Sequence, residues 1–281
     1  MPEAGILRVA AVWATLTLVA VACGSDSQTT SDDPTAVRHL VPRIVVTHPH
    51  DAEAFTQGLE LVDGRLYETT GRYGSSGLRE VDRNTGRVVR HTPLGDELFG
   101  EGFTSLGDGR GVQLTWKAGR AVVWDLASLR PQATLAYGGQ GWGLCRLDDG
   151  TLAMSDGSAR LTLREPDAFR RIGEVEVRLD GEPVERLNEL ECVGSTVWAN
   201  VWLTDRIVGI DLSPGGGSTD VWAPGRVTDV VDASGLVADR SGFGPDDVLN
   251  GIAHDPETGR FLLTGKRWPV LYEVDFVPAG N

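Results

Sequence analysis

The 281-residue sequence contains only two lysines among its 26 Lys and Arg residues, and it has no cluster of basic residues. The formal net charge at pH 7 is −14. Binding to nucleic acid requires clustered positive charge that neutralises phosphates, so this composition argues against a nucleic-acid partner. We expect partners that are neutral or cationic.

The usual motifs of metal and nucleophile chemistry are also missing. Of the five histidines, only His48 and His50 lie close together in the sequence, and two nearby histidines do not make a zinc site. No Ser-His-Asp series or phosphate loop stands out, and a GxGxxG match would mean little in a chain with 36 glycines. The sequence therefore predicts chemistry that requires no metal and no cofactor.

The apolar run near the start of the chain is too short to predict a membrane span. It extends from Val9 to Ala22 and follows one basic residue, Arg8. We interpret residues 1–22 as an export signal. The four residues ending at Cys23, "AVAC", resemble the lipobox of bacterial lipoproteins, in which the cysteine is lipidated, although Ala20 replaces the usual leucine. Small residues at 20 and 22 also suit ordinary signal cleavage.

Either interpretation predicts a location outside the cytoplasm, as a membrane-anchored lipoprotein or as a secreted protein. Residues 23–38 are polar and turn-rich, so we expect a flexible linker there. The folded domain is then expected over residues 39–281, as a monomer. An oxidising compartment permits a disulfide between Cys145 and Cys192, but two buried free thiols fit the sequence equally well.

Many glycines and short apolar runs favour short strands joined by turns over long helices, so we expect an all-β protein. Short segments that end in aspartate recur along the chain, and an aspartate suits a turn because its side chain can bond to the backbone two residues on. Their spacings are 43, 42, 44 and 64 residues. The aspartates are Asp82, Asp125, Asp167, Asp211 and Asp275.

A second series of segments runs in step with these aspartates: "TQGLEL", "GEGFTSL", "GWGLCRL", "NELECV" and "NGIAHD". Together the two series indicate five four-stranded units of about 40 residues, the period of a β-propeller blade. The fifth unit lacks an outer strand at the carboxyl end. Residues 43–49 can supply it, which would close the ring and remove exposed strand edges. A β-sandwich with coincidental spacing is the alternative.

In a propeller the first strand of each blade lines the central channel, so the residues at the start of these strands should share one pocket. They are Gln57, Glu101, Trp142, Glu189 with Asn188, and Asn250. The ends of the second strands add Trp116 with Lys117, Asp156, Trp202 and Lys266. The sequence therefore predicts an aromatic cup that holds a carboxylate, carboxamides and an ammonium group, which is typical of small-molecule sites.

These residues also carry a resemblance to a known family. The motifs cover about residues 44–276 and are similar to those of the plant and bacterial type of glutaminyl-peptide cyclotransferase, also called glutaminyl cyclase. They are "AFTQGLEL", "RLYETTGRYGSSGLREVD", "FGEGFT", "QLTWK", "GQGWGL", "MSDGS", "LNELE", "VLNGIA" and "LTGKRWPVLYEVD". The resemblance implies a five-bladed propeller that converts the N-terminal glutamine of peptides or proteins to pyroglutamate and releases ammonia.

For this reaction we expect Glu101 to carry protons as a general acid and base, because burial in an aromatic cup should raise the pKa of its carboxyl group. Lys266 is expected to stabilise the oxyanion of ring closure. The other predicted contacts bind the substrate through amide groups or aromatic walls. They are Gln57, Asn188, Trp116, Trp142, Trp202, Phe55 and Phe99.

Two other functions fit the same residues. A propeller hydrolase or lactonase could use Glu101, Glu189, Asn188 and Asn250 to hold calcium at the channel mouth, and chelators would then abolish its activity. A non-catalytic binding propeller would keep the aromatic cup but tolerate Glu101→Gln. A structural calcium on aspartates or carbonyls near the channel is a separate alternative that is compatible with the cyclase.

Overall fold

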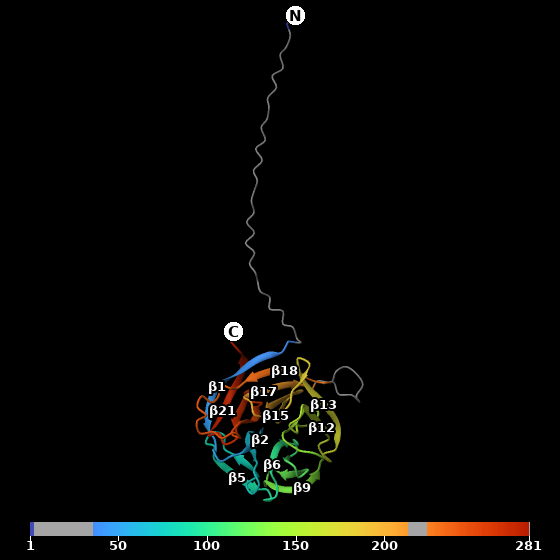
Figure 1. Ribbon diagram of the computed structural model, residues 1–281, viewed down its shortest axis with the longest axis vertical. Helices are drawn as coiled ribbons and strands as arrows, with labels where there is room; N and C mark the ends of the chain where they lie inside the picture. The colour runs from blue at the N-terminus through green and yellow to red at the C-terminus, as the bar shows by residue number, and fades with distance from the viewer. Residues whose placement is uncertain (3–35, 213–223, 281) are drawn as a thin grey trace. The chain divides into compact units, whose positions relative to one another are not determined.

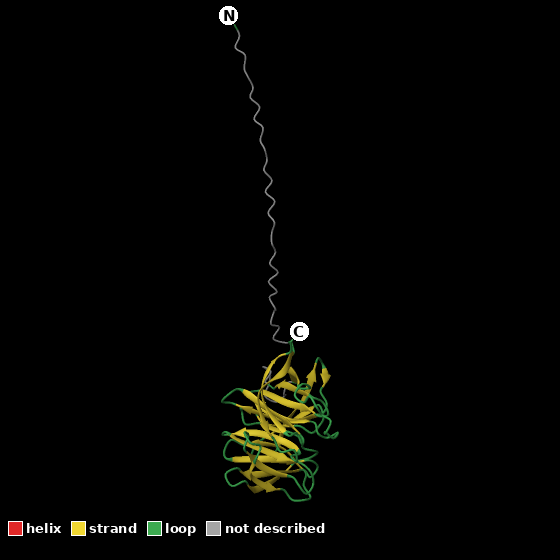
Figure 2. Ribbon diagram, turned by 90° about the vertical axis from the view of Figure 1, so that its left-hand side faces the viewer, coloured by secondary structure: helices red, strands yellow, loops and turns green. Residues whose placement is uncertain are grey.

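The computed structural model describes residues 1–2, 36–212 and 224–280, and all regular elements in these residues are strands (Figures 1 and 2). The chain is therefore all-β, as expected. No helix in the described part is long and apolar enough to cross a membrane. The predicted export signal, Cys23 and most of the predicted linker lie outside the described residues.

Four consecutive antiparallel strands form each of the first two sheets. The first contains β2 (Thr56–Val62), β3 (Arg65–Thr70), β4 (Gly77–Val81) and β5 (Val88–Pro93). The second contains β6 (Gly100–Ser105), β7 (Arg110–Thr115), β8 (Arg120–Asp125) and β9 (Arg130–Ala136).

Three further antiparallel sets are joined into one larger sheet by parallel pairing of β18 with β13 and with β1. The third set is β10 (Leu144–Arg146), β11 (Leu152–Met154), β12 (Arg160–Arg164) and β13 (Arg171–Leu179), and the short β14 (Glu182–Pro183) pairs with the end of β13. The fourth set is β15 (Leu187–Val193), β16 (Thr196–Val201), β17 (Arg206–Asp211) and β18 (Gly225–Asp232). The fifth is β19 (Leu249–Asp255), β20 (Arg260–Gly265), β21 (Val270–Pro278) and β1 (Arg38–Pro49).

The first strand of the described chain pairs with the last. Strand β1 lies antiparallel to β21, with Arg43 opposite Asp275, and Figure 1 shows the blue β1 beside the red β21. An ion pair of 2.7 Å between the Arg43 guanidinium and the Asp275 carboxylate supports this register. The expected pairing of residues 43–49 with the last strand is therefore observed, and β1 itself begins at Arg38.

Three of the five aspartates do not end a strand, contrary to the prediction. Strand β4 ends at Val81, one residue before Asp82. Strand β12 ends at Arg164, because Pro166 has no N–H with which to extend the ladder, and Asp167 falls in the following turn. Asp275 lies within β21, which continues to Pro278 because β1 provides a partner along its length.

Hydrophobic clusters fill the space between successive sets of strands. Leu78 of the first set packs with Trp124 of the second, and Leu114 of the second packs with Leu152 of the third. Further clusters join the third set to the fourth, the fourth to the fifth, and the fifth to the first. Five strands, one from each set, also contact one another: β2, β6, β10, β15 and β19. We call these five the inner strands. In Figure 1, β2, β6 and β15 lie nearer the centre of the folded part than β5 and β9 do.

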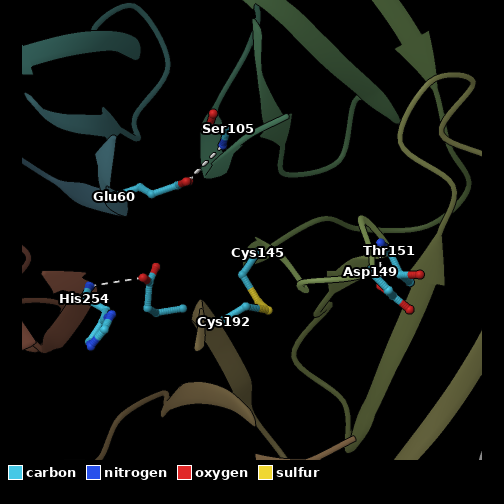
Figure 3. The surroundings of a disulfide bond; sticks show 8 residues. Glu60, Ser105, Cys145, Asp149, Thr151, Cys192 and His254 are labelled. Atoms are coloured by element: carbon cyan, nitrogen blue, oxygen red, sulfur yellow. Dashed lines mark hydrogen bonds between the residues drawn. A yellow bond between two sulfur atoms is a disulfide. The ribbon is translucent and has the colours of Figure 1, made fainter. Parts of the chain in front are cut away.

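A disulfide links two neighbouring inner strands. Cys145 of β10 and Cys192 of β15 are bonded, with their Cα atoms 5.4 Å apart (Figure 3). The sequence left open whether these two cysteines pair or stay free, and the structure shows the pair.

Candidate functional site

A cavity of about 290 Å³ opens where the inner strands begin. All nine residues that the sequence predicted as catalytic or substrate-binding line it. The complete lining is Phe55, Gln57, Arg72, Phe99, Glu101, Trp116, Trp142, Asn188, Trp202, Asp246 and Lys266. Residues up to 211 positions apart in the sequence, Phe55 and Lys266, are thus brought to one site.

Strand irregularities direct the polar side chains into this cavity. The register of β2 against β3 shifts around Gln57, and that of β6 against β7 shifts around Glu101. The same irregularity occurs in β15 around Asn188 and in β19 around Asn250. A bulge of this kind re-aims a side chain at the end of a ladder, so β2, β6 and β15 each turn a polar residue toward the shared space.

Glycine beside these polar residues permits the close approach of the inner strands. The Gly102 N–H donates to the Trp142 carbonyl oxygen over 2.7 Å, and a Cβ on Gly102 would lie 2.6 Å from the Leu144 nitrogen. A side chain there would therefore push β6 away from β10. The second glycine of "GEG" allows the acid of β6 to stand beside the indole that precedes β10.

Glu101 is a buried acid with an open side. Its side chain is 4% exposed, and no hydrogen bond to its carboxylate oxygens is present among the described residues. Burial raises the pKa of Glu101 well above its usual 4.5, and the nearby charge of Lys266 lowers it only in part. A carboxyl group in this setting can both accept and return a proton near neutral pH.

Lys266 is a buried cation that lines the same cavity. It follows β20 directly, is 5% exposed, and has its Nζ 4.9 Å from the centre of the Phe55 ring. Burial lowers the pKa of Lys266 to about 8, although the charge of Glu101 opposes this shift. The charges of the two groups influence each other, no ion pair between them is present among the described residues, and both line the cavity.

A chain of amide groups forms the inner side of the site. The Asn188 side chain donates to the Asn250 Oδ1 over 2.7 Å, and the Asn250 amide donates to the Thr56 carbonyl over 2.9 Å and to the Gln57 Oε1 over 3.3 Å. Asn250 itself does not line the cavity, but it orients Gln57 and Asn188, which do.

Aromatic rings make the walls. Trp142 and Trp202 meet edge to face with their centres 5.3 Å apart, and Phe99 contacts both Phe55 and Trp116. The Gln140 Oε1 accepts from the indole N–H of Trp116 over 2.7 Å and from that of Trp142 over 3.3 Å. Gln140 therefore orients the indole rings of both Trp116 and Trp142.

Several residues that the sequence aligned with the site lie elsewhere. The Glu189 carboxylate accepts the backbone N–H of Leu59 over 3.2 Å and that of Ile252 over 2.8 Å, so it bridges inner strands instead of facing the cavity. Lys117 is exposed, with its Nζ 3.8 Å from the centre of the Trp116 ring. Asp156 accepts the Ser158 N–H in an exposed turn.

Two lining residues were not predicted, Arg72 and Asp246. Both lie in loops that are not part of the repeated strand pattern, so strand register could not place them. Arg72 lies within the quoted motif "RLYETTGRYGSSGLREVD", and Asp246 lies in the loop that precedes β19. A charged residue in a glycine-containing loop was the only available signal.

The oxygen ligands of the predicted calcium alternative do not converge on one cavity. Glu101 and Asn188 line the site, whereas Glu189 and Asn250 direct their polar atoms to backbone groups and to neighbouring amides. Within residues 36–212 and 224–280, no three His, Cys, Asp or Glu side chains form a group that could hold a metal.

Comparisons with known proteins identify the family of this chain. A family model described as glutamine cyclotransferase matches residues 15–276. A curated glutaminyl-peptide cyclotransferase from Arabidopsis thaliana is 39% identical over 233 residues, which are 82% of this chain and 70% of the relative. The crystal structure of Myxococcus xanthus glutaminyl cyclase is similar with a TM-score of 0.78 and 38% identity, over 87% of this chain and 100% of the other.

Proposed function

Because the chain belongs to the glutamine cyclotransferase family, we propose that it converts the N-terminal glutamine of peptides or proteins to pyroglutamate and releases ammonia. The observation that carries the proposal is the cavity itself. A buried acid, Glu101, and a buried cation, Lys266, face one space between indole walls, and neither is neutralised by a direct partner there.

Binding accounts for part of the catalysis. The attacking α-amine and the γ-carboxamide belong to the same substrate residue, so the site has only to hold that residue in its ring-closing conformation. Gln57 and Asn188 offer amide donors and acceptors to the substrate, and unpaired polar atoms there would be costly. Trp116, Trp142 and Trp202, with Phe55 and Phe99, exclude water from the reacting groups.

Proton transfer is assigned to Glu101. As the amine nitrogen forms a bond to the carbonyl carbon of the γ-carboxamide, the Glu101 carboxylate takes a proton from that nitrogen and the carbonyl electrons move to oxygen. When the oxyanion collapses, Glu101 returns the proton to the departing nitrogen, the carbon–nitrogen bond breaks, and ammonia leaves. The raised pKa of Glu101 suits both directions of this transfer.

Charge stabilisation is assigned to Lys266. A buried ammonium group beside the developing oxyanion is already oriented before the reaction begins. With its pKa lowered to about 8, Lys266 is still charged at neutral pH, whereas it loses its charge at moderately alkaline pH.

We propose for the fold a five-bladed β-propeller over residues 39–281, closed by β1 as the last strand of the fifth blade. The five antiparallel sets, the hydrophobic clusters between neighbouring sets and the pairing of β1 with β21 support this assignment. Small-angle scattering with hydrodynamic measurements tests it together with the proposed monomeric state, since a closed ring has a compact profile.

We propose for the cellular location that residues 1–22 direct export, that Cys23 carries a lipid, and that residues 23–38 are a linker. The disulfide between Cys145 and Cys192 supports an oxidising compartment. Expression of the full chain beside Cys23→Ser, followed by membrane fractionation and mass spectrometry, separates a lipoprotein from a secreted protein.

The activity is tested by mixing the purified protein with a peptide that begins with glutamine and measuring ammonia release and the loss of mass in the product. We propose that no metal cofactor is required, so ammonia release should be the same with and without a chelator. Loss of activity in the chelator would favour the calcium-dependent hydrolase, and no turnover by well-folded protein would favour a binding module.

A further inference from the structure

A second hollow adjoins the proposed catalytic cavity. It has a volume of about 370 Å³ and shares two lining residues, Phe55 and Arg72, with that cavity. The two spaces are therefore separated by one wall. A peptide whose first residue fills the catalytic cavity must leave through the mouth, and this wall offers a path for its next residues.

Arg72 is held on this wall in an unusual conformation. Its φ angle of 92° lies in the left-handed region that residues with side chains rarely adopt. The Arg72 carbonyl oxygen accepts the Ser76 hydroxyl over 2.7 Å, and the same hydroxyl accepts the Gly100 N–H over 2.9 Å. The turn that carries Arg72 is thus anchored directly to the start of β6, beside Glu101. Strained backbone that is fixed in this way often marks a functional position.

The Arg72 guanidinium is available to a ligand. It lies 4.3 Å from the centre of the Phe55 ring, and Arg72 is exposed. The ion pairs and hydrogen bonds of the described residues include none from this guanidinium, whereas Arg79 in the second hollow is already bonded to Asp51 and Glu68. A guanidinium group supported by a ring and lacking a carboxylate partner is suited to bind a carboxylate.

We infer that Arg72 forms a subsite for the residue that follows the N-terminal glutamine, and that this subsite favours an acidic side chain. This inference rests on the proposed cyclase activity. The preference should apply to the second residue and not to the third, because an extended peptide advances about 3.4 Å per residue and the third side chain would enter the second hollow. The acids Asp51 and Glu53 line that hollow, and its Arg79 is already paired with Asp51 and Glu68, so another carboxylate is disfavoured there.

Two amidated peptides of identical composition and charge test this position dependence: Gln-Glu-Ala-amide and Gln-Ala-Glu-amide. For the wild-type protein we expect kcat/KM for the first to exceed that for the second by about three- to tenfold, mostly through KM, as for a partly exposed charge-assisted contact. Arg72→Gly should equalise the two peptides. Glycine adopts a positive φ freely, so this variant removes the guanidinium without straining the turn.

A matched variant separates a specific contact from general electrostatics. Lys117→Ala removes one exposed cation that lies over Trp116, a wall of the same cavity, and we expect it to retain the preference for Gln-Glu-Ala-amide. Arg72→Lys should keep part of the preference, because the charge remains but the planar fork is lost.

Failure of the Arg72 subsite and failure of the proposed cyclase activity give different results. Equal rates for the two peptides with wild-type protein, or a preference that survives in Arg72→Gly, would overturn the subsite while leaving the cyclase activity intact. The absence of ammonia from both peptides with folded wild-type protein would overturn the proposed function itself.

Discussion

Glu101 and Glu189 are two buried acids at comparable places in two inner strands, yet they meet opposite surroundings. Both lie within a register shift, in β6 and in β15, and burial raises the pKa of both well above 4.5. The Glu189 oxygens accept two backbone N–H groups, from Leu59 and Ile252. The Glu101 carboxylate faces a cavity that is also lined by the ammonium group of Lys266.

The difference shows that a raised pKa does not by itself identify a proton carrier. Glu189 joins β15 to β2 and β19, so its oxygens are occupied by the structure. Glu101 has the same burial but keeps its oxygens free for a substrate. The open face, together with the pKa, separates the proposed catalytic acid from the structural one.

The largest expected effect is on turnover by Glu101→Gln. This change keeps the size of the side chain and removes its ability to carry a proton, so kcat should fall by about 10² to 10⁴. Ammonia release from a glutamine-initiated peptide measures the loss.

Glu189→Gln is the matched control for that comparison. It removes a buried acid from the neighbouring structural position, and turnover per folded molecule should stay within about threefold of wild type, because the side chain does not touch the substrate. An equal loss of kcat in both variants would erase the distinction between the two acids.

The next effect concerns the group that faces Glu101. Lys266→Met should lower kcat by about 10- to 100-fold, because a preorganised charge near the oxyanion is lost. The pH profile gives the sharper test. Wild-type activity should rise with pH as Glu101 ionises and fall as pH passes about 8, where Lys266 loses its proton. The activity of Lys266→Met should not decrease above pH 8. If it does decrease there, the decrease in wild type is caused by a group other than Lys266.

Repeated strands made most of this site predictable from the sequence. Gln57, Glu101 and Asn188 recur at the starts of inner strands, and Trp116, Trp202 and Lys266 each follow the second strand of a set directly. Residues at equivalent places in repeated units occupy equivalent places around a common centre, so one alignment was enough to bring them together.

Features of the site that depend on the exact strand register or on loop conformation could not be predicted from the sequence. A shift by one residue moves a strand side chain to the opposite face, and this decides that Asn188 rather than Glu189 lines the cavity. Arg72 and Asp246 lie in loops outside the repeat. The pairing of Cys145 with Cys192 depends on a Cα separation of 5.4 Å, which the sequence does not contain.

A third prediction tests the structural side of the comparison. Glu189→Ala leaves the N–H groups of Leu59 and Ile252 without their acceptor, and the free energy of unfolding should fall by about 3 kcal/mol. Urea denaturation measures the change. Glu189→Gln retains one carbonyl acceptor and should lose less. Equal stability of Glu189→Ala and wild type would mean that water replaces the carboxylate, and that the two acids differ less than their contacts indicate.

The smallest expected effect is on the pH dependence of stability, through Glu60 of β2. Its carboxylate accepts the Ser105 N–H over 2.9 Å, as Figure 3 shows, and burial raises its pKa to about 7. Between pH 4.5 and 7 the unfolded chain releases this proton while the folded chain retains it, so the contribution of Glu60 to stability falls as pH rises through this interval.

Glu60→Gln still accepts the Ser105 N–H but does not titrate. Between pH 5 and 8 it should therefore lose less unfolding free energy than wild type, by on the order of 1 kcal/mol. Urea midpoints at the two pH values measure this, with the exposed Glu182→Gln as a control that should follow wild type. If Glu60→Gln loses as much stability as wild type, Glu60 is already ionised in the folded protein. The acids of the inner strands that keep their protons would then be Glu189 and Glu191, because burial also raises their pKa values.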